Sequence, residues 1–233
     1  MVGSNNYGEL ASNNKKMEIY QERVVVFIDI LGFGNLVEST VVDEMEDTEK
    51  VETIIECFNN ALEDIYDVSH RDFVQISHFS DSFVISHTID ESYEDKEARN
   101  RLYFMVFLIT KFIIKAFIKK DILLRGGITR GKVFHKENFL LFGPAMNKAY
   151  NMESKVAKYP RIIIDHEIIY HLKSTIGDSF EQVLDFVSPV IKDDDGEYFL
   201  SYFDDCRTSI IDTVPESNES LKEKKAWLKK YLT

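Results

Sequence analysis

Two aspartates occupy positions from which they could bind a cation. Asp29 ends the apolar segment 23–29 (RVVVFID), and Asp81 lies near the tip of a hairpin predicted over 73–87. A buried strand end is a costly place for an ionised carboxylate unless another charge compensates it. If these strands are neighbours, both carboxylates reach one sheet edge, where like charges raise each other's proton affinity unless a cation lies between them. A divalent metal ion would meet that need and would attract polyphosphate.

Glycines follow the first aspartate directly. Gly32 and Gly34 interrupt the strand as a tight turn would. Small residues let backbone N–H groups approach phosphate oxygens. From the residues alone, Asp29 and Asp81 could equally be turn or capping residues, so a purely structural role stays open.

The elements needed to position these residues alternate between strands and helices. Asp165 is expected to cap the helix that follows it. Predicted helices cover 51–68, 98–119, 143–158, 166–173 and 220–232, and further strands or hairpins cover 122–134 with 138–142, 161–165 and 186–203. This order predicts an α+β sandwich whose antiparallel-rich sheet is covered on one side by helices.

Composition limits the class of protein. The chain has 233 residues, 44% of them hydrophobic, and a net charge of −12. This apolar content suffices for a packed core. The acidic balance argues against a general nucleic-acid coat. Cys57 and Cys206 lie in no metal-binding spacing, which indicates reduced thiols.

No segment predicts export or membrane insertion. The polar segment 1–20 lacks an apolar signal core and is interpreted as a flexible leader. The most apolar run, 103–117, is interrupted by Lys111 and Lys115 and is shorter than the roughly 20 residues of a membrane span. We therefore expect a soluble cytoplasmic protein without membrane or nucleic-acid partners.

Four segments, in order, resemble motifs of the class III nucleotidyl cyclases. Segment 27–34 (FIDILGFG) is similar to the first metal-binding motif, and 79–86 (FSDSFVIS) to the second metal-Asp hairpin, with Ser80 where Gly is usual. Segment 123–133 (LLRGGITRGKV) resembles the family's Arg-x-Gly-Ile-x-x-Gly strand. Segment 142–154 (FGPAMNKAYNMES) resembles the helix that holds ribose and triphosphate. Together they imply a ferredoxin-like βαββαβ cyclase sandwich.

The resemblance implies roles for individual residues. Asp29, Ile30 and Asp81 would bind two Mg²⁺ or Mn²⁺ ions, and the backbone from Ile30 to Gly34 would cradle phosphates beside Phe33. Asn147 would orient the ribose while its 3′-OH attacks the α-phosphate and pyrophosphate leaves. One ion lowers the proton affinity of the 3′-OH and the other neutralises the leaving group. The family's active site forms between two catalytic domains, which implies a head-to-tail homodimer.

This sequence departs from the family pattern at several positions. The transition-state Arg of the family falls on Asn151, which carries no charge. Arg125, Arg130 and Arg161 are the candidates to replace it. The purine-reading positions fall on Ser77 and Leu140, a small hydroxyl and an apolar side chain that match neither adenylate nor guanylate cyclases.

Bacterial pyrimidine cyclases of Pycsar anti-phage systems resemble the chain best. This implies conversion of UTP, in preference to CTP, to a cyclic monophosphate sensed by a separate effector. A cyclase-fold module that binds nucleotide without turnover, and a purine cyclase with atypical base contacts, remain alternatives. The predicted organisation is a leader over 1–20, a catalytic domain over 21–205, and a tail with a terminal helix over 206–233.

Overall fold

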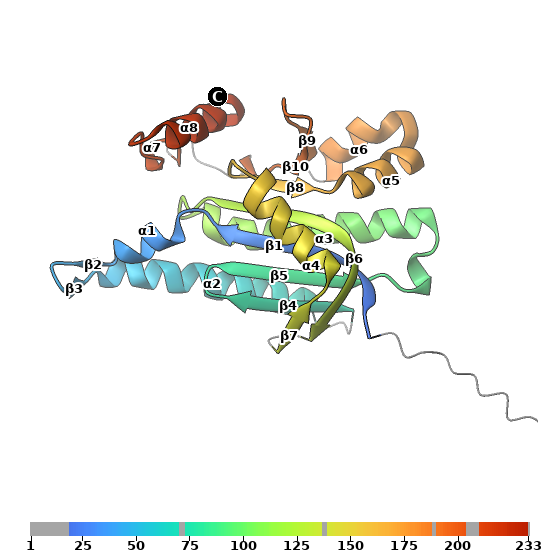
Figure 1. Ribbon diagram of the computed structural model, residues 1–233, viewed down its shortest axis with the longest axis horizontal. Coiled ribbons are helices and arrows are strands. Elements are labelled where there is room, and N and C mark those ends of the chain that lie inside the picture. Colours follow the sequence, from blue (N-terminus) through green and yellow to red (C-terminus); the bar gives the residue numbers. More distant parts are fainter. Residues whose placement is uncertain (1–18, 70–72, 137–138, 188–189, 204–209, 233) are drawn as a thin grey trace, which may run out of the picture.

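The computed structural model describes residues 19–69, 73–136, 139–187, 190–203 and 210–232 (Figure 1). The predicted leader thus lies almost wholly outside the described residues. The main sheet has the strand order β4-β5-β1-β6-β8-β10-β9, and β7 pairs with β6. Its strands are β1 (Gln21–Ile30), β4 (Val74–Phe79), β5 (Ser82–Thr88), β6 (Leu124–Lys136), β7 (Leu140–Phe142), β8 (Ile162–Ile164), β9 (Val190–Lys192) and β10 (Tyr198–Leu200). All of these pairs are antiparallel except β6 with β8.

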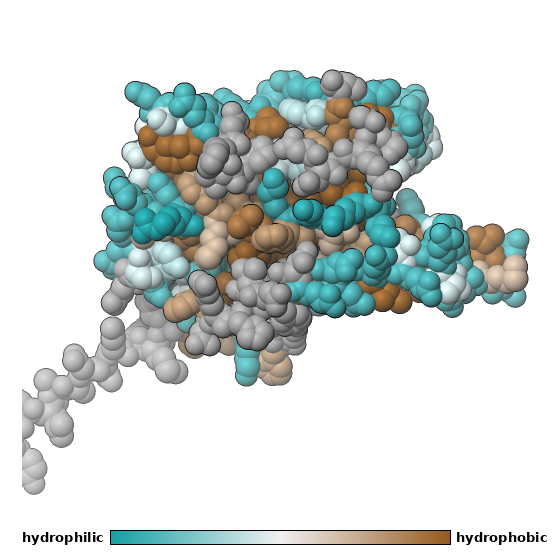
Figure 2. All heavy atoms as spheres, turned by 180° about the vertical axis from the view of Figure 1, so that it is seen from behind, coloured by the Kyte–Doolittle hydropathy of each residue, from teal (hydrophilic) through white to brown (hydrophobic). Residues whose placement is uncertain are grey.

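Helices and short turns connect these strands. The α-helices are α1 (Phe33–Glu38), α2 (Thr48–Ser69), α3 (Lys96–Ile118), α4 (Pro144–Asn151), α5 (His166–Ile176), α6 (Phe180–Val187), α7 (Ile210–Thr213) and α8 (Glu219–Leu232). The shorter helical segments are η1 (Glu91–Tyr93), η2 (Met152–Val156) and η3 (Gly177–Ser179). A small ribbon of β2 (Val41–Val42) and β3 (Met45–Glu46) projects beside α1, and Figure 2 shows apolar atoms at the end of this projection.

Strand β1 is central because it is apolar on both faces. It pairs with β5 on one side and β6 on the other. Val24, Val26 and Ile28 are fully buried in the larger core, whereas Val25 and Phe27 join a second cluster with Ala145 and Ala149 of α4. Successive side chains of a strand point to opposite faces, so β1 supplies both cores and the sheet is covered on both sides.

Two different helical layers cover the sheet. Helices α2 and α3 pack together on one face, and α4 crosses the other (Figure 1). Gly127 permits the close approach of α4, because a Cβ there would lie 2.6 Å from the Met152 Cβ and 2.8 Å from the Ala149 carbonyl oxygen. The predicted α+β fold with an antiparallel-rich sheet is confirmed. Helices α2 and α3 provide the predicted cover on one side, and α4 adds a helix on the other.

The structure confirms one helix start predicted from the sequence and changes one predicted helix. Asp165 caps α5 as predicted, since its side chain accepts a hydrogen bond from the backbone N–H of Glu167. The predicted helix over 143–158 is instead α4 followed by the π-helical turn η2. Close packing of this segment on β6 accompanies the wider turn, and π-turns of this kind recur at functional sites.

The last helix belongs to the same core as the sheet. Trp227 of α8 packs against Phe199 of β10, with ring centroids 5.6 Å apart, and Tyr231 stacks on Phe203 at 5.8 Å. The apolar run 103–117 lies within α3, which buries it in the core. Among the helices that the structure describes, none is long and apolar enough to cross a membrane.

Candidate active site

The strand end of β1 and the turn between β4 and β5 bring Asp29 and Asp81 together. Asp29 lies opposite Ser82 of β5, and the backbone N–H of Ile30 donates to the carbonyl of Asp81 at 3.1 Å. Ser80 enters this turn with a left-handed φ of 51°, a conformation that the family's usual Gly adopts without strain. Burial and the nearby charge of Asp81 raise the pKa of Asp29. The two carboxylates thus share one sheet edge.

Arg125 lies on the other side of Asp29. It is opposite Asp29 in the β1–β6 register, and its Nη2 lies 3.3 Å from Asp29 Oδ2. The Ser82 hydroxyl donates to Asp29 Oδ1 at 3.1 Å. Both contacts lower the pKa of Asp29 and so oppose the effects of burial and of Asp81. Asp29 therefore shares its oxygens between a hydroxyl and a guanidinium.

The donors at this edge fit a hard divalent cation. Carboxylate oxygens are the ligands that Mg²⁺ and Mn²⁺ prefer. Within the described ranges, no three His, Cys, Asp or Glu side chains are grouped so that they could hold a metal ion by themselves. Magnesium usually takes one or two protein carboxylates and completes its shell with water and substrate phosphate. Asp29 and Asp81 meet that requirement. Ile30, which the resemblance also places among the metal-binding residues, follows Asp29 at the same strand end.

The turn after β1 leaves backbone exposed beside the aspartates. Gly32 has a left-handed φ of 79°, which glycine adopts without strain, and precedes α1. A Cβ on Gly32 or Gly34 would meet no other atom within 4 Å, so the space beside this backbone is open. Phe33 packs edge-on against Phe58 of α2, with centroids 6.2 Å apart. Its described contact is with the core, not with the open space.

Glu153 is a site residue that the sequence analysis missed. It comes from η2, is only 2% exposed, and its Oε1 lies 2.6 Å from Arg125 Nε. Burial raises the pKa of Glu153 to about 7, and the charges of Asp29 and Asp81 add to this, whereas Arg125 lowers it. The only signal in the sequence is an acidic residue two positions after Asn151, and the π-turn that directs it inward is not visible there.

The two asparagines of α4 point away from the sheet. Ala145 and Ala149 are the buried residues of this helix, whereas Asn147 and Asn151 are exposed. Residues four apart share one helix face, so both asparagines lie on the outer side of α4. Helix α4 therefore presents both asparagines to the outside, away from the sheet that carries Asp29.

A match to a family model identifies the family of the chain that carries this site. The model of the adenylate and guanylate cyclase catalytic domain matches residues 15–193, a span that contains Asp29, Asp81, Arg125, Asn147 and Glu153. The chain belongs to this cyclase catalytic-domain family. A search of curated protein sequences gave no significant match.

Solved cyclase structures resemble the chain over most of its length. The adenylyl cyclase CyaB from P. aeruginosa is 18% identical, with a TM-score of 0.45 over 66% of this chain and 82% of that chain. A bacterial light-regulated adenylyl cyclase is 15% identical, with a TM-score of 0.49 over 88% and 98%. The monomeric guanylyl cyclase domain of RhoGC from Blastocladiella emersonii is 18% identical, with a TM-score of 0.45 over 78% and 95%.

Ser77, which the resemblance places at a base-reading position, is buried in a polar network. Its hydroxyl lies 2.9 Å from Nε2 of His135, whose Nδ1 lies 2.7 Å from the Ser86 hydroxyl. Arg23 Nε donates to the Ser86 hydroxyl at 2.8 Å. Burial, together with the Arg23 charge, lowers the pKa of His135 to about 4. The imidazole is therefore neutral at pH 7, and it fixes the position of the Ser77 hydroxyl.

Leu140, the other residue that the resemblance places at a base-reading position, lies on an exposed apolar strand. Leu140 of β7 is 46% exposed, and its neighbours Phe139 and Phe142 are also exposed. Leu141, the next residue, pairs with His135 of β6. The pairing of Leu141 with His135 therefore places Leu140 one residue away from the polar network around Ser77.

Arg130 does not lie beside Asp29. It is opposite Val24 in the register, on the face covered by α2 and α3, and its Nη2 lies 3.3 Å from a Glu22 oxygen. Burial lowers the pKa of Arg130, but the nearby Tyr103 of α3 and the charge of Glu22 raise it and outweigh burial. The strand register corrects the expectation that Arg130 reaches the edge of the site. Arg130 is on the face of α2 and α3, whereas Asp29 is on the face of α4.

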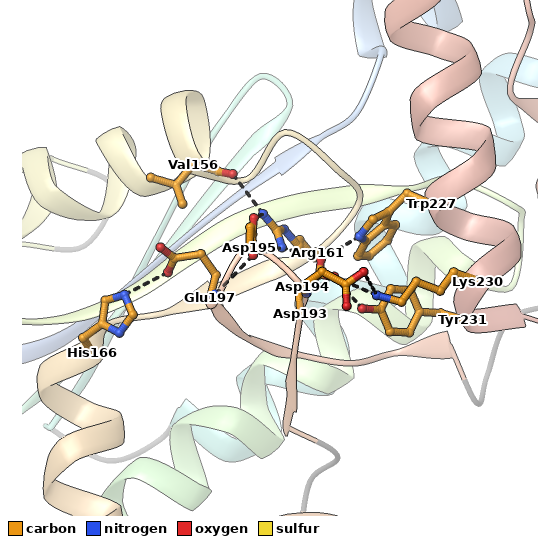
Figure 3. Close-up of polar contacts among 10 residues, drawn as sticks. All are labelled: Val156, Arg161, His166, Asp193, Asp194, Asp195, Glu197, Trp227, Lys230 and Tyr231. Atoms are coloured by element: carbon orange, nitrogen blue, oxygen red, sulfur yellow. Dashed lines mark hydrogen bonds and ion pairs between the residues drawn. The ribbon is translucent and has the colours of Figure 1, made fainter.

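Arg161 also lies away from Asp29, and it binds two other aspartates (Figure 3). Its fully buried guanidinium lies 2.5 Å from Asp193 through Nη1 and 2.5 Å from Asp195 through Nη2. Trp227 Nε1 and the Tyr231 hydroxyl of α8 donate to Asp193 at 2.6 and 2.7 Å. Arg161 joins β8, the β9–β10 turn and α8, so the structure gives it a stabilising role and no free guanidinium for substrate.

Asp193→Asn is expected to lower the free energy of unfolding by about 3 kcal/mol, because it leaves a buried guanidinium short of one carboxylate. Burial acts to raise the pKa of Asp193, but hydrogen bonds from Tyr231 and Trp227 outweigh it and lower the pKa to about 2. This stability is present above the unfolded pKa of about 4 and is lost as the pH falls toward 2. Urea unfolding at pH 7 measures the loss.

The matched control is Asp194→Asn. The Asp194 side chain is 88% exposed, and it pairs with Lys230 at the surface. Surface ion pairs contribute little, so this variant should unfold like the wild type. Equal urea midpoints for Asp193→Asn and Asp194→Asn would contradict the stabilising role of the Arg161 cluster.

Proposed function

We propose that this cyclase-family chain is a metal-dependent pyrimidine nucleotidyl cyclase. It would convert UTP, in preference to CTP, to the 3′,5′-cyclic monophosphate and pyrophosphate. The observation that carries the catalytic part is the meeting of Asp29 and Asp81 at one sheet edge. Two Mg²⁺ or Mn²⁺ ions, when bound, would supply neutralising charge for the triphosphate and for the oxygens that gain charge during the reaction.

The chain's own residues would bind and orient the substrate. Asp29 and Asp81 hold the cations, and backbone N–H groups from Ile30 to Gly34 bind phosphate oxygens. Arg125 is beside Asp29, and its planar guanidinium suits bidentate contact with phosphate. Asn147 orients the ribose so that the 3′-OH faces the α-phosphate. Because Asn151 is uncharged, Arg125 is our candidate for the missing cation.

Ser77 and Leu140 support a pyrimidine as the base. The Ser77 hydroxyl is held by neutral His135, and Leu140 presents an apolar surface. Neither offers the charged group that a purine-reading position carries in the adenylate or guanylate cyclases that the sequence resembles. Uracil and cytosine differ by one exchange of O4 for N4, which one or two hydrogen bonds can read.

A head-to-tail homodimer would complete the site. Asn147 and Asn151 face outward from α4, away from the aspartates of their own chain. Phe139, Phe142 and Tyr150 are also exposed, and a second copy of the chain would bury them. The cyclic product would act in the cytoplasm as an anti-phage signal for a separate effector, by the resemblance to Pycsar cyclases.

Incubation with each of the four NTPs and Mn²⁺, followed by mass identification of the product, tests this proposal. We expect cyclic UMP, formed roughly tenfold or more faster than any purine product, as apolar pocket discrimination allows. A purine cyclic nucleotide as the main product would favour the purine alternative. Tight NTP binding by calorimetry without turnover would favour the binding-module alternative, which Asn151 motivates, and no binding of any NTP would refute the proposal.

A further inference from the structure

Three charged side chains form a chain from the sheet edge into the protein interior. Arg125 stands in the middle, 3.3 Å from Asp29 and 2.6 Å from Glu153. The side chains of Asp29 and Arg125 are 16% and 28% exposed, whereas that of Glu153 is only 3% exposed. One guanidinium therefore serves two carboxylates, and the inner one is almost sealed from solvent.

The backbone holds Glu153 firmly in this position. The π-helical turn η2 lies against β6, and the Glu153 backbone nitrogen lies 3.5 Å from where a Cβ of Gly127 would be. Arg125 is on the same strand, two residues before Gly127. Close packing of strand and turn leaves Glu153 little freedom to follow another partner, and a buried carboxylate without a cation is costly.

The two carboxylates differ in what substrate would do to them. Asp29 lies at the open edge, where a cation that arrives with a triphosphate would take up its charge. Its attraction for Arg125 would then weaken. Glu153 lies beneath, out of reach of solvent, and would keep its attraction for Arg125.

We propose that Glu153 is a positioning residue that acts through Arg125. When Asp29 binds the cation of a metal–triphosphate complex, Glu153 keeps the guanidinium of Arg125 at the site. Arg125 can then bind phosphate. This inference rests on the proposed function. It also links two parts of the site, because α4 carries Asn147 and Asn151 on its outer face and continues into the turn that carries Glu153. Movement of α4 would change both.

A double-mutant cycle tests this action through Arg125. Arg125→Gln, Glu153→Gln and the double variant are compared with wild type in their affinity for a non-hydrolysable UTP analogue with Mn²⁺, measured by calorimetry. We expect Arg125→Gln to weaken binding about tenfold or more, and Glu153→Gln about fivefold. The double variant should match Arg125→Gln alone, because Glu153 then has nothing to hold. Additive losses, or unchanged affinity in Glu153→Gln, would overturn the proposal.

The matched control is Glu52→Gln, at an exposed position of α2, which should leave the affinity unchanged. A crystal structure of Glu153→Gln with Mn²⁺ bound at Asp29 gives a second answer that needs no nucleotide. We expect the guanidinium of Arg125 to leave its place between β6 and η2. An Arg125 unmoved from its contact with Asp29 would overturn the inference even if the enzyme cyclises UTP. If Arg125 is displaced in Glu153→Gln but the protein binds no NTP, the result would refute the proposed function instead of this inference.

Discussion

Asp29→Asn is expected to lower the turnover number of the cyclase about 10²- to 10³-fold, because it weakens the binding of a cation that would stabilise the charge on the reacting phosphates. The amide keeps the shape of the side chain and can still accept from the Ser82 hydroxyl, which donates to Asp29 at 3.1 Å. It cannot supply the anionic ligand that a hard divalent cation needs. Pyrophosphate release from UTP with Mn²⁺ measures this loss.

The same variant should remain as stable as wild type. Burial and the Asp81 charge raise the pKa of Asp29, so the folded state disfavours the ionised form relative to the unfolded state. The charged form therefore costs stability at neutral pH, and this cost disappears as the pH falls below the folded pKa. An uncharged amide avoids the cost, and only its weaker contact with Arg125 opposes this gain. Thermal unfolding of Asp29→Asn and of the wild type at pH 7 tests this expected equality of stability.

Asp43→Asn is the matched control for Asp29→Asn. Asp43 lies in the exposed turn of the β2–β3 ribbon with a φ of 50°, a conformation that asparagine also adopts. This substitution removes an equal charge at an exposed turn outside the proposed site and should leave turnover unchanged. Full activity in Asp29→Asn would show that the cations are not held at this strand end.

Local patterns were sufficient to predict the elements around the aspartates. The apolar run before Asp29 predicted a central strand, and the alternation around Asp81 predicted the hairpin of β4 and β5. Both signals depend on near neighbours in the sequence. The same holds for Asp165, where a capping residue precedes an amphipathic segment.

Contacts made across the sheet could not be predicted in the same way. The expectation for Arg130 failed because strand register decides which face a side chain takes, and Arg130 pairs with Val24 rather than with a residue of the Asp29 face. Arg161 was a reasonable candidate from its place before a strand. Its partners Asp193 and Asp195 lie more than 30 positions later, on a turn whose position depends on the whole fold.

Glu153 shows a further limit of sequence reasoning. An ordinary α-helix over 143–158 would place its side chain by a period of 3.6 residues. The π-turn after Asn151 changes that period and directs Glu153 to Arg125. The turn is accompanied by close packing of α4 and η2 against Gly127, a contact between two segments that the sequence does not place together.

The proposed head-to-tail dimer leads to the last prediction, which concerns pairs of inactive variants. Asn147→Ala should lower turnover roughly 100-fold, because ribose orientation is lost. A dimer with one Asp29→Asn subunit and one Asn147→Ala subunit has both defects in one site and none in the other. Statistical mixing makes half of the dimers mixed, so roughly a quarter of wild-type activity should return when the two variants are co-expressed.

A matched pair shows whether such recovery comes from shared sites. Asp29→Asn co-expressed with Asp81→Asn should stay inactive, since both residues belong to the same half-site and every site keeps one defect. Tandem affinity tags isolate the mixed dimers in both cases, and pyrophosphate release is measured on each. Recovery in the first pair alone requires that each site takes its aspartates from one chain and Asn147 from another. If neither pair recovers although mixed dimers form, each chain must build its site alone, and the outward direction of Asn147 on α4 would need another explanation.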